Sequence, residues 1–173
     1  MIETSRLSLR LVALSDLENI HRLLYADPEV ALPWTGHVQS LAEVSAPNGV
    51  LSMISRAADE PGLLAVERAA DYALIGLAGI LPIRRASDRA RFVPASPADV
   101  PGSVEGRVEG ELVVALGFGS LRYSRIVASV GSRNERGVKL LRRLGFRTEP
   151  NQRADPDTGS SVPGTLGFLD APS

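Results

Sequence analysis

The sequence predicts a single α/β domain of short strands and amphipathic helices that extends over residues 1–173. Residues 6–12 alternate leucine with polar residues, which is the period of a strand with one buried face. Residues 63–68 and 72–83 are apolar runs joined by a tight turn, as expected of two neighbouring strands. Residues 133–146 carry apolar side chains at helical spacing. No internal repeat or linker interrupts the chain, so we expect one domain.

The composition excludes several classes of protein. Apolar residues make up 44% of the chain and charged residues 23%, which is ordinary for a globular domain. The net charge of -1 gives no reason to expect nucleic acid or a membrane surface as a partner. The absence of cysteine excludes thiolate catalysis and disulfides, and with two histidines we expect no metal site. The chain begins without the apolar core of a signal peptide, so we expect a cytoplasmic location.

Local signals place three short helices in the first third of the chain. Residues 15–18 have the pattern of a capping box, in which a serine and a glutamate satisfy the first backbone donors of a helix. The Asp-Pro pair at 27–28 is predicted to end that helix, and residues 31–39 are predicted to form a loop. A second capping box at 40–43 opens a helix that the Pro-Asn-Gly sequence at 47–49 divides in two.

Strands and helices are predicted to alternate in the second half of the chain. Between residues 84 and 110 the sequence is rich in arginine, proline, serine and glycine, which predicts two loops around a short strand at 90–94. The remaining predicted elements are a buried helix at 111–121, an apolar central strand at 126–130, a short strand after residue 146, a polar turn at 154–161 and a last strand at 165–169.

The helix predicted within residues 133–146 has both of its ends marked in the sequence. Gly145 suits the left-handed position beyond the helix end, from which Phe146 folds back onto Leu141. Gly137 breaks the helical pattern, because a glycine inside a helix costs about 1 kcal/mol relative to alanine. We therefore expect something to approach the backbone closely at Gly137.

Two stretches carry a resemblance to a known family. The sequence Asn134-Glu-Arg-Gly137, followed by Leu-Leu-Arg-Arg-Leu-Gly-Phe at 140–146, resembles the Asn-x-x-Ala/Ser…Tyr/Leu-Glu-Lys-Leu-Gly-Phe segment of the GNAT superfamily of N-acetyltransferases. Residues 3–10, with Asp-Pro-Glu-Val at 27–30, resemble the opening of the branch that acetylates the N-termini of ribosomal proteins. The resemblance implies a mixed, mostly antiparallel central sheet with helices on both faces.

The resemblance also implies a cofactor, a reaction and the residues that serve it. The cofactor would be acetyl-CoA, and the reaction a direct transfer of acetyl to a primary amine, either a protein N-terminus or a small amine. Asn134 and Gly137 would line the slot for the pantetheine arm. By the same resemblance, Leu141 would stand near the CoA sulfur, where other members have a tyrosine acid and this branch usually has leucine. We expect a monomer or a homodimer.

The family binds the CoA pyrophosphate on backbone N–H groups at a helix start, in the pattern Gln/Arg-x-x-Gly-x-Gly/Ala. Two alignments of that pattern are open here. In one, Gly106-Arg107 matches a pair common in the family but Val108 replaces the next glycine. In the other, Arg107 and Gly110 match but Leu112 replaces the last small residue. The stretch from here to the end of the predicted helix is also about one helical turn short of the family pattern.

Acidic residues around this stretch leave a second function open. Glu105, Glu109 and Glu111 suit the positive end of a helix dipole, but they compete with a phosphate for the same donors. The sequence is therefore also compatible with a non-catalytic domain of this fold that acts as a binding or interaction module. The helix-interior glycine at Gly137 favours the enzyme.

Basic residues gather around the last helix, and Glu135 is the acidic residue that opposes them. Their positive charge would attract the CoA phosphates, or would simply form a solvated helix face. Arg133 and Arg136, near the helix start, are the better candidates for the first role. The full set is Arg122, Arg125, Arg133, Arg136, Lys139, Arg142, Arg143 and Arg147.

No residue stands out as the catalytic base. Acetyl transfer requires loss of a proton from the attacking ammonium and polarisation of the thioester carbonyl, often by a backbone N–H. His37 is a candidate base that with Trp34 would form a wall for the acceptor, although a histidine on a loop is also well explained as solvated. His21 is expected to be structural. The acidic candidates from the predicted loop and helix start are Glu105, Glu109, Glu111 and Asp99.

Overall fold

One sheet forms the framework of the computed structural model, which describes residues 2–35, 37–47, 49–57, 62–83, 86–95, 105–131, 134–151 and 164–172. Within these residues the sheet has eight strands in the order β1-β2-β3-β4-β5-β6-β8-β7. The strands β5 and β6 pair in parallel and the other neighbours are antiparallel, as predicted. The strands are β1 (Ile2–Glu3), β2 (Leu7–Leu11), β3 (Leu63–Arg68), β4 (Leu74–Ile83), β5 (Ala86–Ala95), β6 (Arg125–Gly131), β7 (Arg147–Asn151) and β8 (Gly164–Asp170).

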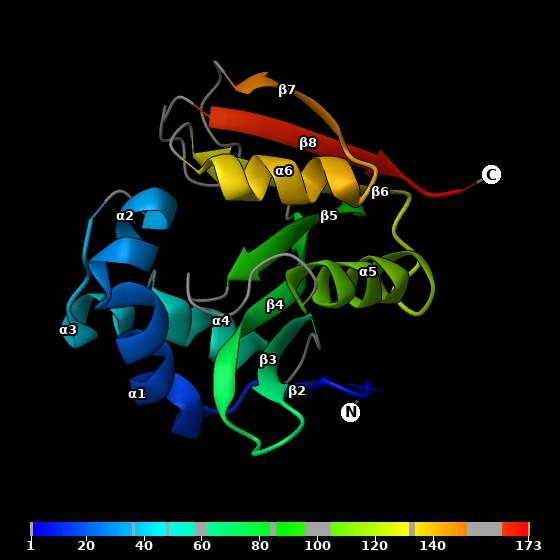
Figure 1. The fold of residues 1–173 in the computed structure, drawn as a ribbon. Helices are drawn as coiled ribbons and strands as arrows, with labels where there is room; N and C mark the ends of the chain where they lie inside the picture. Colours follow the sequence, from blue (N-terminus) through cyan, green and yellow to red (C-terminus); the bar gives the residue numbers. More distant parts are fainter. Residues whose placement is uncertain are drawn as a thin grey trace.

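Helices cover both faces of the sheet (Figure 1). The described helical segments are the 3₁₀ turn η1 (Leu14–Asp16), α1 (Leu17–Ile20), the π-helix η2 (His21–Tyr25), α2 (Pro28–Thr35), α3 (Leu41–Val44), α4 (Val50–Ala57), α5 (Glu105–Phe118) and α6 (Glu135–Arg143). None of the helices in the described part of the chain is long and apolar enough to cross a membrane.

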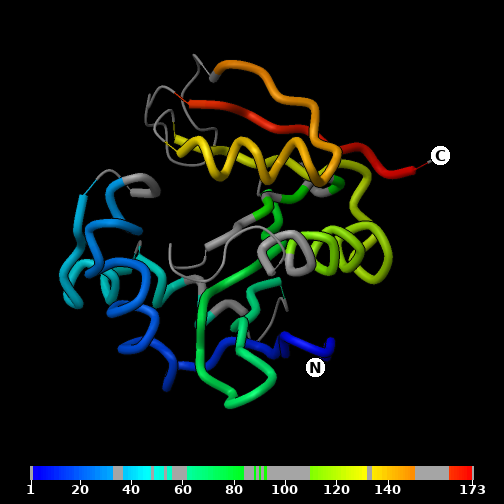
Figure 2. The backbone as a smooth tube through the Cα atoms, viewed as in Figure 1, coloured from blue at the N-terminus to red at the C-terminus, as the bar shows by residue number. Residues whose placement is uncertain are grey.

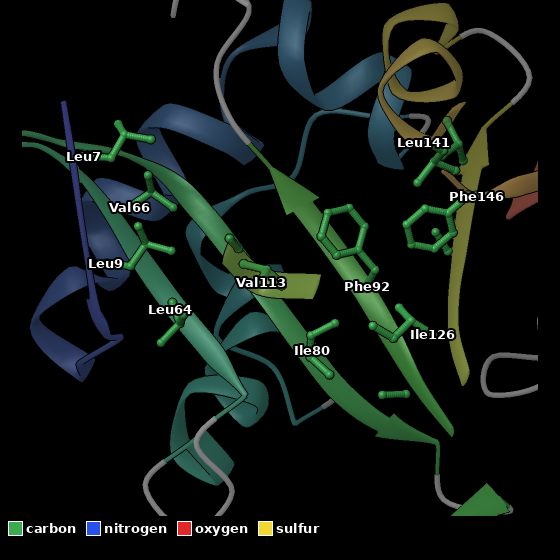
Figure 3. Close-up of a cluster of buried hydrophobic side chains, with 14 of the residues drawn as sticks. Leu7, Leu9, Leu64, Val66, Ile80, Phe92, Val113, Ile126, Leu141 and Phe146 are labelled. Carbon is green, nitrogen blue, oxygen red and sulfur yellow. The ribbon is translucent and has the colours of Figure 1, made fainter. Parts of the chain in front are cut away.

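Successive residues of the central strands serve two separate hydrophobic clusters, because side chains alternate between the faces of a sheet. Leu64 and Val66 of β3 belong to a cluster that α5 and α6 complete with Val113 and Leu141 (Figure 3). The opposite face carries Leu63 and Ala65 of β3. There they pack in a cluster that η2, α3 and α4 complete with Leu24, Val44 and Ile54.

The strand predicted at residues 6–12 is buried on both faces rather than on one. Leu7 and Leu9 lie in the cluster beneath α5 and α6, as expected, but Ser8 on the other face is also buried. Leu11, predicted to be buried, is 51% exposed. The period-two pattern indicated the strand correctly, whereas its burial depends on the helices that cover the second face and on where the strand leaves the sheet.

The first helix begins two residues earlier than predicted, and a different carboxylate caps it. Asp16 Oδ2 accepts a hydrogen bond from the Ala13 N–H at 2.8 Å, so the capping box predicted at residues 15–18 is wrong. Arg10 binds Asp16 through Nη1 at 2.7 Å and Nη2 at 2.8 Å, and its Nε binds Glu67 Oε1 at 2.8 Å. The hydrogen bonds from the Arg10 guanidinium lower the pKa of the Asp16 carboxyl below its ordinary value.

Residues 31–39 were predicted to be a loop, but most of them belong to α2. Asp27 Oδ1 accepts a hydrogen bond from the Glu29 N–H at 2.9 Å, and Pro28 occupies the first helical position. An aspartate cap followed by proline is a helix-start signal, because proline lacks the N–H that a helix start leaves unpaired. The Asp-Pro pair therefore ends one helix and begins the next.

Several other local predictions are confirmed. The capping box at residues 40–43 is present, with the Ser40 N–H donating to Glu43 Oε2 at 2.7 Å and the Glu43 N–H to Ser40 Oγ at 3.3 Å. Two short helices, α3 and α4, follow where one divided helix was predicted.

Two later elements differ from their predicted bounds. The strand β5 is longer than the predicted 90–94, and α5 begins at Glu105 instead of residue 111. The turn predicted at 154–161 lies outside the described residues.

Candidate functional site

The parallel strands β5 and β6 pair along only part of their length. Within the described residues their ladder runs from Arg89–Arg125 to Arg91–Val127. Beyond it β5 continues to Ala95, still paired with β4, and β6 continues to Gly131, still paired with β8. The two strands therefore diverge toward their C-terminal ends, and in Figure 3 Phe92 and Phe146 lie between them, with ring centroids 5.8 Å apart.

Three helices border the open end of these diverging strands. The strands β5 and β6 point to the same side of the molecule, on the left in Figure 1, and α5 and α6 both begin on that side. The helix α2 also lies there, and it contacts β6. The first N–H groups of a helix have no partner within it and carry partial positive charge. The open end of the strands therefore combines two helix N-termini with a backbone edge that is not paired across the gap.

Asn134 caps α6 with its side-chain oxygen. Asn134 Oδ1 accepts a hydrogen bond from the Gly137 N–H at 2.8 Å, and the Asn134 N–H donates to the Gly131 carbonyl at 3.0 Å. This bond fixes the orientation of the amide, since only the oxygen can accept from an N–H. The remaining polar atom of the side chain is Nδ2, which can only donate. Asn134 thus joins the end of β6 to the start of α6 and brings one amide donor to the site.

The close approach predicted at Gly137 comes from the protein itself. A Cβ atom at Gly137 would lie 2.8 Å from Val130 Cγ1 on β6 and 3.1 Å from Asn134 Cγ. Contacts this short require a neighbour to move, so the glycine lets α6 lie directly on β6. Gly137 is therefore explained by helix packing, and it no longer distinguishes a cofactor-binding domain from a non-catalytic one.

Leu141 is fully buried and forms part of the helix end. The Phe146 N–H donates to the Leu141 carbonyl at 3.0 Å and the Gly145 N–H to the Arg142 carbonyl at 3.1 Å, with Gly145 at φ 88°. These two bonds form a Schellman motif, and the predicted contact of Phe146 with this part of α6 accompanies it. Both side chains lie over Gly167 of β8, since a Cβ there would be 3.0 Å from Leu141 Cδ1 and 3.2 Å from Phe146 Cδ1. In this conformation Leu141 contributes to packing and is not exposed to a ligand.

The two alignments of the phosphate-binding pattern fall at different depths in α5. Gly106 and Arg107 lie in the first turn, where backbone N–H groups have no helical partner. Gly110 lies deeper in the helix, and a Cβ there would be 2.6 Å from Cδ1 of Leu144, the residue that follows α6. Gly110 therefore serves the contact between α5 and the end of α6, and the phosphate role predicted for it stays a prediction. Glu105 is the first residue of α5, and the structure does not describe the side chains of residues 105–109.

The predicted acceptor-side residues fall in different places. Trp34 belongs to the last turn of α2, the helix beside β6, but its side chain lies outside what the structure describes. His37 follows in the segment that joins α2 to α3, which runs along the left margin of Figure 1, on the far side of α2 from β5. Its Nε2 is 3.9 Å from Glu43 Oε1, and both side chains are more than half exposed. The structure thus brings α2 to the site but ties His37 to α3. Asp99 and Arg133 lie outside the described residues.

The basic residues around α6 have more acidic partners than predicted. Asp170 at the end of β8 pairs with Arg125 at 2.5 Å and with Arg147 at 3.2 Å. Arg142 donates to Thr148 Oγ1 at 3.3 Å. These residues lie at the start of β6, on β7 and in the last turn of α6, away from the diverging ends of β5 and β6. Among the described basic residues of the set, Arg136 is the one in the first turn of α6.

The described residues contain no group of three or more histidine, aspartate and glutamate side chains that could hold a metal ion. The described part of the site offers backbone donors at two helix starts and the side-chain amide of Asn134. Such a site suits an anionic ligand that extends along a strand, because the backbone edge offers hydrogen bonds and the helix ends offer positive potential.

Comparisons with known proteins agree with this geometry. Residues 6–147 match the model of the acetyltransferase (GNAT) domain family. No curated protein is similar enough in sequence to be matched to this chain.

Solved structures share the fold at low sequence identity. The ribosomal-protein-S5-alanine acetyltransferase from Vibrio fischeri superposes with a TM-score of 0.75 at 18% identity, covering 98% of this chain and 95% of that one. A GNAT-family acetyltransferase from Bacillus anthracis superposes with a TM-score of 0.75 at 13% identity, covering 98% of this chain and 97% of that one. The spermidine N-acetyltransferase from Vibrio cholerae, solved with CoA and spermine, gives 0.72 at 19% identity, with 96% of each chain covered.

Proposed function

This chain belongs to the GNAT family of acetyltransferases, and we propose that it transfers acetyl from acetyl-CoA to a primary amine. The observation that carries the proposal is the divergence of β5 and β6, with the starts of α5 and α6 at its open end. A CoA molecule has a polyamide arm and a pyrophosphate. The unpaired strand edges suit the arm, and the helix N-termini suit the pyrophosphate.

The proposed cofactor contacts follow from the positions of the residues. Gly106 and Arg107 would present first-turn N–H groups of α5 to the pyrophosphate, with Arg107 and Arg133 adding positive charge. Asn134 Nδ2 would donate to a carbonyl of the pantetheine arm while Oδ1 continues to cap α6. Gly137 and Leu141 would act indirectly, by holding α6 on β6 and β8.

The reaction requires little chemistry from the protein. The neutral amine attacks the thioester carbonyl, the C–N bond forms, and the C–S bond breaks to release CoA as a thiolate that takes up a proton. A backbone N–H on the unpaired edge of β5 would polarise the carbonyl oxygen as negative charge develops there. We assign removal of the ammonium proton to Glu105, directly or through water, because Glu105 begins α5, whose start borders the open end of β5 and β6.

The acceptor is proposed from the class of reaction and from the relatives. The names of two of the similar structures specify an alanine of ribosomal protein S5 and spermidine as acceptors, and spermidine carries primary amines. We therefore propose a protein N-terminus or a small amine as acceptor and α2, with Trp34, as part of its binding wall. The domain would span residues 1–173 and act as a monomer or homodimer.

A second candidate is a non-catalytic domain of the same fold that binds a partner. The observation in its favour is that Val130 explains Gly137 and Leu144 explains Gly110, so neither glycine requires a ligand. The replacement of a family glycine by Val108 points the same way.

An acetyl-transfer assay distinguishes the two candidates. Purified protein is incubated with acetyl-CoA and either an alanine-terminated peptide or spermidine, and both the released thiol and the acetylated acceptor are measured. We expect turnover with at least one acceptor. Glu105→Gln should lower kcat by about 100-fold without raising the KM for acetyl-CoA, while the matched control His37→Ala should stay within about twofold. Absence of turnover with either amine would contradict the enzyme proposal.

A further inference from the structure

The π-helix η2 binds both backbone groups of a residue that follows α2. His21 Nε2 lies 2.9 Å from the Gln39 carbonyl oxygen, and the Gln39 N–H donates to the Tyr25 carbonyl at 3.0 Å. A carbonyl oxygen can only accept, so Nε2 of His21 must carry the proton and donate. The contact is partly buried, where a hydrogen bond is stronger than at the surface.

The His21 carbonyl also holds Ala26, which caps η2 two positions before α2 begins. The Ala26 N–H donates to the His21 carbonyl at 2.8 Å, an i to i+5 bond that makes this turn a π-helix. The carbonyl of His21 thus fixes Ala26 in the link before α2, and the imidazole of His21 fixes Gln39 after α2 ends. His21 therefore binds both segments that flank α2, Ala26 before the helix and Gln39 after it. The stretch of chain between these two residues, which contains α2, is called the α2 excursion below. Short π-helical segments of this kind often occur at functional sites.

The helix α2 is in contact with the wall of the candidate site. It touches β6, the strand that forms one side of the diverging pair, and its inner residue Ala31 is fully buried. The path of the chain is visible in Figure 2, where the blue tube leaves α1, forms α2 beside the open end of β5 and β6, and returns to α3. A shift at the base of this excursion would change how α2 lies against β6.

We propose that His21 is a positioning residue that sets the acceptor side of the site by clamping both ends of the α2 excursion. This inference rests on the proposed function, in which the cofactor occupies the gap between β5 and β6 and α2 borders the acceptor. The clamp acts on α2 and not on α5 or α6, so it affects acceptor binding and leaves cofactor binding unchanged.

The test compares His21→Leu, which removes the donor, with His21→Gln, which retains a donor near the position of Nε2. Hydrogen exchange followed by mass spectrometry reports the protection of residues 26–40 in the full chain. We expect exchange there to be about tenfold faster in His21→Leu, as loss of one part-buried hydrogen bond implies, and near wild type in His21→Gln.

Kinetics with the better of the two acceptors supply the second readout. His21→Leu should raise the KM for the amine about fivefold and leave the KM for acetyl-CoA within about twofold, and His21→Gln should restore the wild-type values. Unchanged protection in His21→Leu, failure of His21→Gln to restore it, or an equal rise of both KM values would overturn the proposal. If the wild type acetylates neither amine, the proposed function fails, and the exchange data alone then support or overturn the clamp.

Discussion

At the scale of single residues, Gly137 decides how closely α6 approaches β6. An added methyl group would lie 2.8 Å from Val130 Cγ1. Overpacking of this kind costs about 1–3 kcal/mol, and the better helix propensity of alanine returns about 1 kcal/mol. We predict that Gly137→Ala lowers the free energy of unfolding by about 1 kcal/mol, measured by urea denaturation.

The control for this prediction is the same substitution, Gly137→Ala, made in a protein that already carries Val130→Ala. Val130→Ala removes the methyl group that the new side chain would meet, at its own cost in buried apolar contacts. In that background Gly137→Ala should cost less than in the wild type, because the contact with Val130 Cγ1 is gone, while the 3.1 Å approach to Asn134 Cγ and the propensity gain remain. An equal cost of Gly137→Ala in both backgrounds would contradict the packing explanation.

Asp16 is the residue for which stability should depend on pH. Its carboxylate receives two hydrogen bonds from Arg10 and one from the Ala13 N–H, and its pKa is lowered in the folded state. A lowered folded-state pKa gives stability that is present above the unfolded-state pKa of about 3.9 and is lost as the pH falls through the folded-state pKa. We predict that Asp16→Asn lowers the free energy of unfolding by about 2 kcal/mol at pH 7, because it removes charge-assisted hydrogen bonds.

The pH dependence separates this ion pair from a simple packing effect. The difference in unfolding free energy between the wild type and Asp16→Asn should shrink as the pH falls below about 4. Glu18→Gln, a change of an exposed carboxylate on the same helix, should show little difference at any pH. A difference for Asp16→Asn that stays constant from neutral to acidic pH would argue against the pair.

At the scale of elements, α6 shows how much of a helix can be predicted from the residues within it and next to it. Gly145 beyond the end and the apolar stripe lie within one short stretch, so the helix and its C-terminal end could be predicted, whereas the capping role of Asn134 was not predicted. The capping box at residues 40–43 was predictable for the same reason. The helix α2 was not predicted, because the Asp-Pro pair at 27–28 is both a stop signal for one helix and a start signal for the next.

The end of α6 also allows a direct test. Gly145 has φ 88°, where a side chain strains the backbone, and the nearest atom to an added Cβ is Leu169 Cδ1 at an ordinary 3.7 Å. Gly145→Ala should therefore lower the free energy of unfolding by about 1–2 kcal/mol through backbone strain alone. Gly145→Asn, which tolerates this conformation better, should cost less. Thermal denaturation of the two variants measures the difference, and equal melting temperatures would contradict the assignment of strain.

At the scale of the whole molecule, the site depends on contacts that no local pattern contains. The antiparallel sheet and the helices on both faces could be expected from strand periods and from the family resemblance. No local pattern contains the partial ladder between β5 and β6, because it depends on how two strands far apart in the sequence pair, and it could be expected only from the family resemblance. The clamp of His21 on Gln39 and the binding of Arg10 to Asp16 and Glu67 are likewise tertiary contacts between residues that are individually unremarkable.

The central claim is that the gap between β5 and β6 is a working acetyl-CoA site. Its most direct test is calorimetric titration of acetyl-CoA into the wild type and into Asn134→Asp. The aspartate retains the oxygen that caps α6, so the melting temperature should not fall, but it lacks the Nδ2 donor. We predict micromolar binding by the wild type and about tenfold weaker binding by the variant, the worth of one buried hydrogen bond. No binding by the wild type at millimolar acetyl-CoA would contradict the account and leave a domain of this fold that serves another partner.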